Sequence, residues 1–195
     1  MDYIYSGVCF WLPCFIWQLV NRENMRHRQH AVWHIAWTYV FILYCYLATE
    51  VAADMGTMWD LLRYKAIMGR VYMRPFVVDE ITSHILNVIM FMPLGFLLPC
   101  IWGNFRNIWK TICIGFFMSL AIEVSQLFCY RVTDINDLIT NTAGTLVGYC
   151  VWICTNSLTN ISKKKFEGIS GSEAVVYIFG GMIGIFIMYN RVLLR

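Results

Sequence analysis

The sequence contains few charged residues, and this shortage excludes most classes of soluble protein. Only 14% of its 195 residues are Asp, Glu, Lys or Arg, whereas 59% are hydrophobic and 16% are aromatic. A soluble domain is typically about 45–50% apolar and about 25% charged. The formal net charge is only +3, and we expect no nucleic-acid partner. The composition predicts an integral membrane protein.

The sequence also lacks the short motifs that usually mark catalysis, redox chemistry and secretion. It has no phosphate-binding P-loop lysine and no signature of an activated nucleophile. Its eight cysteines form no CxxC pair and are scattered through apolar runs, where free cysteine behaves as a small hydrophobic residue. No A-x-A-like cleavage site follows the first apolar run, which therefore reads as a membrane anchor. We expect no cofactor and no bound metal.

Six apolar runs are long enough to cross a membrane as helices. About 30 Å of hydrocarbon requires roughly 20 helical residues. The runs cover residues 3–20, 31–51, 85–102, 111–128, 138–156 and 173–190. They leave no room for a separate soluble domain, so we predict a single all-α, polytopic membrane domain over residues 1–195.

The distribution of Lys and Arg predicts the orientation of these helices, because cytoplasmic loops are enriched in positive charge. The three short loops on one side are the densest in Lys and Arg. They contain Arg22, Arg26, Arg28, Arg106, Lys110 and Lys163 to Lys165. If that side is cytoplasmic, both termini are extracytoplasmic.

The long second loop, residues 52–84, has the pattern of a helix lying in the membrane interface. Its apolar and charged side chains fall on opposite sides of a helix. The apolar side holds Leu61, Tyr64, Met68 and Tyr72, and the charged side holds Asp60, Arg63, Arg70 and Arg74. Proline disfavours helix in the residue before it, so this helix would stop at Pro75. A solvated loop is the alternative.

Three histidines, His27, His30 and His34, share one helical face at the start of the second run. Three ligands at this spacing could hold a metal ion. However, Arg26 and Arg28 lie among them and would repel a cation. We therefore favour an ordinary basic, aromatic-rich edge at the level of the lipid head groups.

A carboxylate, Glu123, lies in the middle of the fourth apolar run. A carboxylate near the centre of a bilayer costs several kcal/mol, so such groups usually face a protein interior or a wet cavity. Ser119, Glu123 and Gln126 lie on one face of this helix because they are spaced at i, i+4 and i+7. This face is the first candidate for a functional site.

The start of the fifth run supplies a complementary face with Asp137, Asn141, Gly144 and Gly148 at i, i+4, i+7 and i+11. The glycines match small-xxx-small packing, in which two helix backbones approach closely. We expect this face to meet Glu123 and Gln126 on the fourth run. Asp134 and Asp137 could instead cap the start of the fifth helix.

The third run carries Asn87, Pro93, Gly95 and Pro99. A proline inside a membrane helix frees a carbonyl group, which neighbouring side chains or helices must satisfy. We expect a bent or broken helix here, which would open space beside Glu123.

These motifs, in the order LNVIMFMPLGFLLP and then SLAIEVSQLFCYRVTDINDLITNTAGTLVGY, resemble the VanZ-like family of bacterial membrane proteins over about residues 74–150. By resemblance, the motif positions are Pro93, Gly95, Glu123, Gln126, Arg131, Asp134, Asp137, Asn141, Gly144 and Gly148. Asn136 stands where many members have another acidic residue. The resemblance implies a place in the bacterial cytoplasmic membrane. It also implies a link to teicoplanin, a lipid-tailed glycopeptide, with no established reaction.

Three functions remain open. The first is a non-catalytic envelope factor that binds an amphiphile at the outer leaflet, either a lipoglycopeptide or a lipid-linked cell-wall precursor. Arg74 and Arg131 would then meet an anionic head group. The second is an intramembrane enzyme that uses Glu123 as base with Asp134 or Asp137 as acid. The third is a small transporter, although the sequence shows no inverted repeat.

Overall fold

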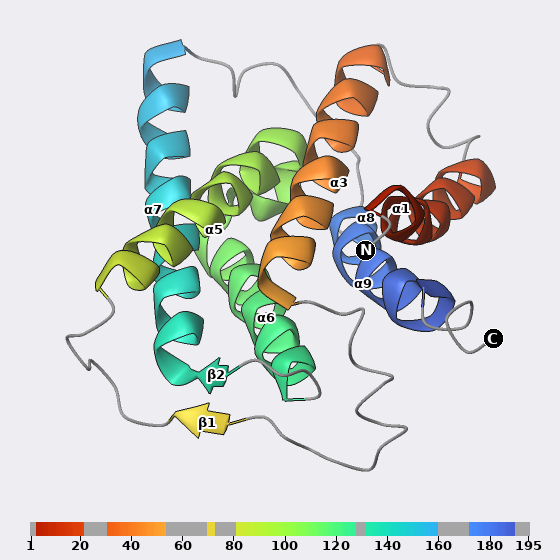
Figure 1. Ribbon diagram of the computed structural model, residues 1–195. Coiled ribbons are helices and arrows are strands. Elements are labelled where there is room, and N and C mark those ends of the chain that lie inside the picture. Colours follow the sequence, from red (N-terminus) through yellow and green to blue (C-terminus); the bar gives the residue numbers. More distant parts are fainter. Residues whose placement is uncertain are drawn as a thin grey trace.

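The protein is described from a computed structural model, which describes residues 3–21, 31–53, 70–72, 81–127, 132–159 and 172–189. Most of these residues are helical (Figure 1). The long helices are α1 (Tyr3–Val20), α3 (Ala31–Ala53), α5 (Ile81–Ile101), α6 (Ile108–Gln126) and α7 (Ile135–Thr159), and the short helix η3 (Gly103–Arg106) joins α5 to α6. The last segment runs continuously through α8 (Ser172–Val175), η5 (Val176–Gly180), α9 (Gly181–Gly184) and η6 (Ile185–Tyr189), of which η5 and η6 are π-helical.

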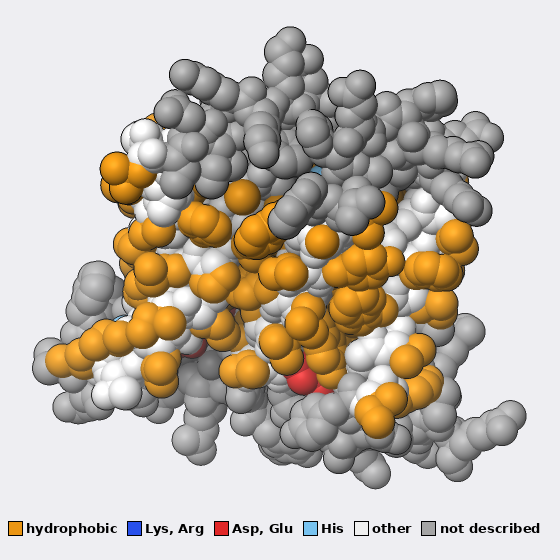
Figure 2. Space-filling view, turned by 90° about the horizontal axis from the view of Figure 1, so that it is seen from above, with side chains coloured by type: hydrophobic (Ala, Val, Ile, Leu, Met, Phe, Trp, Pro, Cys, Tyr) orange, Lys and Arg blue, Asp and Glu red, His pale blue; other side chains and the backbone are white. Residues whose placement is uncertain are grey.

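Four of the described helices have the length and apolar composition of membrane spans: residues 34–52, 81–101, 108–126 and 135–158. Two further apolar helices, residues 4–20 and 172–187, are shorter. Large hydrophobic side chains are exposed along all of these helices, as expected for surfaces that face lipid. Figure 2 shows them covering most of the described part of one face. The chain is therefore a multi-pass helical membrane protein.

The tightest helix contact joins α5 to α7 through three glycines. A Cβ atom added at Gly95 of α5 would collide with the carbonyl oxygen of Thr145 on α7. In the reverse direction, a Cβ at Gly144 or Gly148 of α7 would collide with the carbonyl oxygens of Val88 and Met92 on α5. The sequence predicted the close packing but assigned the wrong partner, because Gly144 and Gly148 face α5 rather than α6.

Helix α6 contacts α7 through other residues. A Cβ at Gly115 would collide with the side chain of Thr145, and the Asn141 side chain donates a hydrogen bond to Ser119 Oγ over 2.9 Å. The expected meeting of the fourth and fifth runs therefore occurs, but through Gly115, Thr145 and the Ser119–Asn141 pair.

The prolines of α5 do not break it, since the helix is continuous from Ile81 to Ile101 with Pro93 and Pro99 inside. In the turn before Pro93, the Met90 carbonyl accepts a hydrogen bond from the Tyr44 hydroxyl of α3 over 2.9 Å, which ties α3 to α5 beside the proline. Of the two alternatives expected here, the broken helix is therefore wrong, and the bent helix stays a prediction.

Two short strands, β1 (Arg70–Tyr72) and β2 (Val132–Asp134), form a parallel pair in which Arg70 lies opposite Val132 and Tyr72 opposite Asp134. The predicted interfacial helix is thus wrong over residues 70–72, which form a short strand, whereas the predicted helical fold is confirmed. The physical reason is that the extended approach to α7 offers unpaired backbone groups, which β1 satisfies. The other residues of the predicted interfacial helix lie outside the described part of the chain.

The arrangement of the helices places several of their ends together. The end of α3, the end of α6 and the start of α7 lie at the side of the bundle that carries β1 and β2, at the bottom of Figure 1. Helix α1 and the α8–η6 segment pack together on the opposite side of α3 from α7 (Figure 1). Gly181 and Gly184 allow this contact, because a Cβ at either position would collide with Phe10 or with the Cys9 carbonyl.

Candidate functional site

A cavity of about 280 Å³ lies among α3, α5, α6 and α7, near the strand side of the bundle. All four helices contribute side chains to it. We call this cavity the polar pocket, and its lining residues are Val51, Ala52, Ser83, Leu86, Asn87, Met90, Ile122, Glu123, Gln126, Asp137 and Asn141. The structure therefore brings together five residues that the sequence selected: Asn87, Glu123, Gln126, Asp137 and Asn141.

Glu123 lies at the inner wall of the polar pocket and is only 4% exposed. Its Oε2 atom accepts a hydrogen bond from the backbone N–H of Asp134 over 3.1 Å. Its Oε1 atom has no hydrogen-bond partner among the described residues. A buried oxygen without a partner costs about 1–3 kcal/mol, and more when it is charged, so this oxygen is available to a ligand.

Gln126 and Asn141 are amides that also line this pocket. Gln126 Nε2 donates to the backbone carbonyl of Ala52 over 2.7 Å. Because a carbonyl can only accept, this bond fixes the orientation of the Gln126 amide. Its Oε1 atom, like Asn141 Oδ1, is buried and has no partner in the part of the chain that the structure describes.

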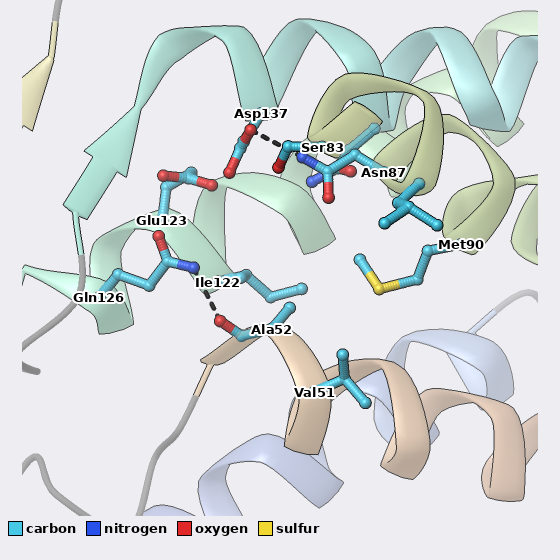
Figure 3. A pocket seen from close by; sticks show the side chains of 11 residues that line it. Val51, Ala52, Ser83, Asn87, Met90, Ile122, Glu123, Gln126 and Asp137 are labelled. Carbon is cyan, nitrogen blue, oxygen red and sulfur yellow. Dashed lines mark hydrogen bonds between the residues drawn. The ribbon is translucent and has the colours of Figure 1, made fainter. Parts of the chain in front are cut away.

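The two aspartates that the sequence selected have different positions. Asp137 lines the pocket, and its Oδ1 accepts a hydrogen bond of 2.7 Å from Asn87 on α5 (Figure 3). Asp134 does not line the pocket. Its Oδ1 accepts from the backbone N–H of Asn136 over 2.9 Å, at the start of α7. Asp134 is therefore the N-cap of α7, one of the two interpretations that the sequence left open.

The remaining predicted residues either pack helices beside the pocket or lie outside the described part of the chain. Gly95, Gly144 and Gly148 hold α5 and α7 together next to the pocket, and Pro93 belongs to the same helix as Asn87. Arg74 and Arg131 lie outside the described residues. Within the described ranges, no group of three or more His, Cys, Asp or Glu side chains is placed to hold a metal ion.

The pocket changes character from its deep end to its mouth. Figure 3 shows Glu123, Gln126, Asp137, Asn87 and Ser83 grouped at one side, with Met90 and Val51 farther from the carboxylates. The apolar side chains Val51 of α3 and Leu86 of α5 are 64% and 59% exposed. These two residues flank an opening between α3 and α5 that would face lipid in a membrane.

A second buried polar cluster was missed by the sequence analysis. Glu173 of α8 is only 1% exposed, and its carboxylate accepts from Trp102 Nε1 over 2.7 Å and from the Tyr177 hydroxyl over 2.9 Å. His34 Nε2 lies 3.3 Å from Glu173 Oε2 and is also buried. His34 is therefore buried between helices and is not part of an exposed basic edge, whereas His27 and His30 lie outside the described residues. Glu173 stands at the very start of its apolar run, where it resembled an ordinary terminal charge.

This second cluster lies at the other end of α3 from the polar pocket. His34 is near the start of α3, whereas Ala52, which binds Gln126, is near its end. At 1.5 Å per residue, the two positions are roughly 27 Å apart along the helix. Among the described residues, a buried glutamate thus lies near each end of α3, and of these two Glu123 lines a cavity and has an unpartnered oxygen.

Comparison with known proteins gives two matches. The VanZ/LLP1 family model matches residues 4–156. Protein VanZ from Enterococcus faecium is 35% identical over 86 residues, which cover 43% of this chain and 50% of that protein. The chain thus matches about half the length of this curated relative. No solved structure matches. The family match spans all four helices that form the polar pocket, and the chain belongs to the VanZ/LLP1 family.

Proposed function

We propose that this protein is a non-catalytic factor of the bacterial cell envelope that lowers sensitivity to teicoplanin-type lipoglycopeptides by binding an amphiphile in the polar pocket. The VanZ family is linked to teicoplanin resistance, which supplies the envelope context. The amphiphile would be the lipoglycopeptide itself or a lipid-linked cell-wall precursor. Both combine a polar head group with an apolar tail.

One observation carries this proposal, namely the division of the pocket into a polar interior and an apolar mouth. The interior holds the buried side chains of Glu123, Gln126 and Asn141. The mouth is flanked by exposed Val51 and Leu86 on two helices of spanning length. A head group could bind among the polar side chains while its tail stays between α3 and α5 in the lipid. Ligand sites usually have this combination of apolar walls and a few convergent polar groups.

The positive charge in the loops supports an outward-facing pocket. If the loops rich in Lys and Arg are cytoplasmic, the ends of α3 and α6 and the start of α7 are extracytoplasmic. The polar pocket then lies at the level of the outer leaflet, where a lipoglycopeptide arrives. Both termini would be extracytoplasmic in the same arrangement.

Susceptibility testing gives the direct check of this function. Expression in a susceptible host is expected to raise the inhibitory concentration of teicoplanin more than that of a glycopeptide without a lipid tail. The Glu123→Gln variant should lose most of this protection at unchanged membrane abundance, because it removes the charge but keeps the size of the side chain. Full protection by a well-expressed Glu123→Gln protein would contradict a functional role for this carboxylate.

Glu50→Gln is the matched control for that experiment. Glu50 lies on α3 near the same end of the bundle, but its Oε1 accepts from Ser6 of α1, and it does not line the pocket. The same change of carboxylate to amide should therefore leave protection intact. Equal loss in both variants would point to a general effect of charge on folding.

A second candidate is an intramembrane enzyme that acts on a lipid-linked wall component. The observation in its favour is that Glu123 of α6 and Asp137 of α7 line the same pocket. General acid–base catalysis requires two such groups in different protonation states. Turnover of a labelled lipid-linked precursor by the purified protein in proteoliposomes, lost in Asp137→Asn, would favour the enzyme over the binding factor.

A further inference from the structure

We infer that the polar pocket binds the primary ammonium group of an amphiphile. This inference rests on the proposed function and specifies which chemical group the pocket recognises. Glu123 Oε1, Gln126 Oε1 and Asn141 Oδ1 are all buried, all line or adjoin one cavity, and all lack a partner among the described residues. Each is an acceptor oxygen, so the missing partner must be a hydrogen-bond donor.

The amide nitrogens of the lining residues already have partners. Gln126 Nε2 is bonded to the Ala52 carbonyl, Asn141 Nδ2 to Ser119, and Asn87 Nδ2 to Asp137. The buried atoms that the described lining residues leave without a partner, Glu123 Oε1, Gln126 Oε1 and Asn141 Oδ1, are all oxygens that accept hydrogen bonds.

The charge of the pocket points to a cation. Glu123 and Asp137 contribute two carboxylates, and none of the described lining residues is Lys, Arg or His. An uncompensated buried carboxylate is costly, and a positive group beside it is the usual compensation. A primary ammonium supplies one positive charge and three donors with no acceptor, which matches the three unpartnered oxygens.

The size and shape of the pocket favour an ammonium on an amphiphile over a bare ion. The cavity of about 280 Å³ far exceeds the roughly 30 Å³ that one water molecule occupies. It has room for the rest of a small head group. The exposed apolar side chains of Val51 and Leu86 give the attached tail a path to the lipid. Aminophospholipids and teicoplanin, which has a free amine, share this chemistry.

The test uses matched probes with and without the ammonium group, because acetylation removes the positive charge and leaves a single N–H. The full-length protein in a neutral detergent is titrated with short-chain phosphatidylethanolamine and with its N-acetyl derivative, and separately with teicoplanin and N-acetyl teicoplanin. In at least one pair, the free amine should bind about tenfold or more tightly than the acetylated form, as expected for charge-assisted hydrogen bonds. The pair that shows the difference identifies the source of the amine.

Glu123→Gln should abolish this preference for the free amine, and Glu50→Gln should preserve it. If acetylated and free forms bind equally, and pocket variants weaken both, the ammonium assignment is overturned while amphiphile binding stands. If no probe of either form binds, both the assignment and the proposed function fail. Tight binding of calcium chloride that competes with the amine would replace the ammonium with a metal ion.

Discussion

Leucine in place of Gly148 is expected to remove most of the folded protein from the membrane. The glycine Cα of α7 faces the Met92 carbonyl of α5, and even a single added carbon atom would collide with that backbone oxygen. Neither partner can move aside, because both are backbone atoms within helices. Overpacking of this kind typically costs about 1–3 kcal/mol and sometimes more, and leucine adds a four-carbon side chain. Membrane abundance and thermal stability in detergent measure the effect.

Gly180→Ala is the matched control, because it places a Cβ in a helical region of the same protein without a collision. The nearest atoms would be Val176 Cγ1 at 3.6 Å and Pro13 Cβ at 3.9 Å, which are ordinary contact distances. Alanine is also a better helix former than glycine. This control should therefore match or exceed wild-type stability. Normal abundance and stability of Gly148→Leu would show that α5 and α7 do not pack as closely as described.

The packing of α5 on α7 also matters for the polar pocket. Gly144 fits against Val88, the residue next to Asn87, and Asn87 binds Asp137 two turns earlier on α7. The glycines bring the two helices close enough for this hydrogen bond to form. A loss of packing at Gly148 should thus disturb the pocket as well as the fold, and function cannot be measured cleanly in that variant.

The positions of the helices could be predicted from the sequence because length and hydropathy alone determine them. The predicted runs 3–20 and 31–51 correspond to α1 (Tyr3–Val20) and α3 (Ala31–Ala53), and the later runs agree to within a few residues. The lengths of α1 and of the last segment are marginal for a span, which composition alone did not distinguish. Helices that cross a membrane can be recognised in a sequence as long apolar runs, because in lipid each helix must form all of its backbone hydrogen bonds internally.

The partners of those helices could not be predicted in the same way. Spacing showed that Gly144 and Gly148 share a face with Asp137 and Asn141, and all four do face the region around the pocket. The spacing of these residues on α7 does not indicate which neighbouring helix packs against the two glycines. Gly95 on α5 could have identified α5 as the partner of α7, because a glycine on each of two helices allows the closest approach of their backbones.

The site was predicted in part because burying a carboxylate in an apolar run is costly and therefore informative. Glu123, Gln126, Asp137 and Asn141 do line one cavity. The separation of Asp137 from the capping residue Asp134 required the structure, since both stand where a helix begins. The same rule failed for Glu173, whose partners Trp102 and His34 come from distant parts of the chain.

Alanine in place of Glu173 is expected to destabilise the protein strongly. The change would leave Trp102 Nε1 and the Tyr177 hydroxyl without their carboxylate partner in a fully buried site, and His34 would lose its hydrogen-bond partner. Each buried donor left without an acceptor costs about 1–3 kcal/mol. The loss should appear as a lower melting temperature in detergent and as reduced membrane abundance.

Two further variants separate this network from a simple loss of side-chain volume. Trp102→Phe removes one donor, but the carboxylate keeps Tyr177 and His34, so its destabilisation should be smaller than that of Glu173→Ala. Glu50→Ala removes a carboxylate that is only partly buried and bonded to Ser6, and it should cost less than either. If all three variants melt at the same temperature, the Glu173 carboxylate does not hold these helices together. Glu173→Ala ranks first because it leaves two buried donors without an acceptor, and an unpaired polar group is more costly than a lost hydrogen bond. Trp102→Phe removes a donor and leaves a cavity at a fully buried position, whereas Glu50 is only partly buried and Ser6 keeps its contact with Tyr46.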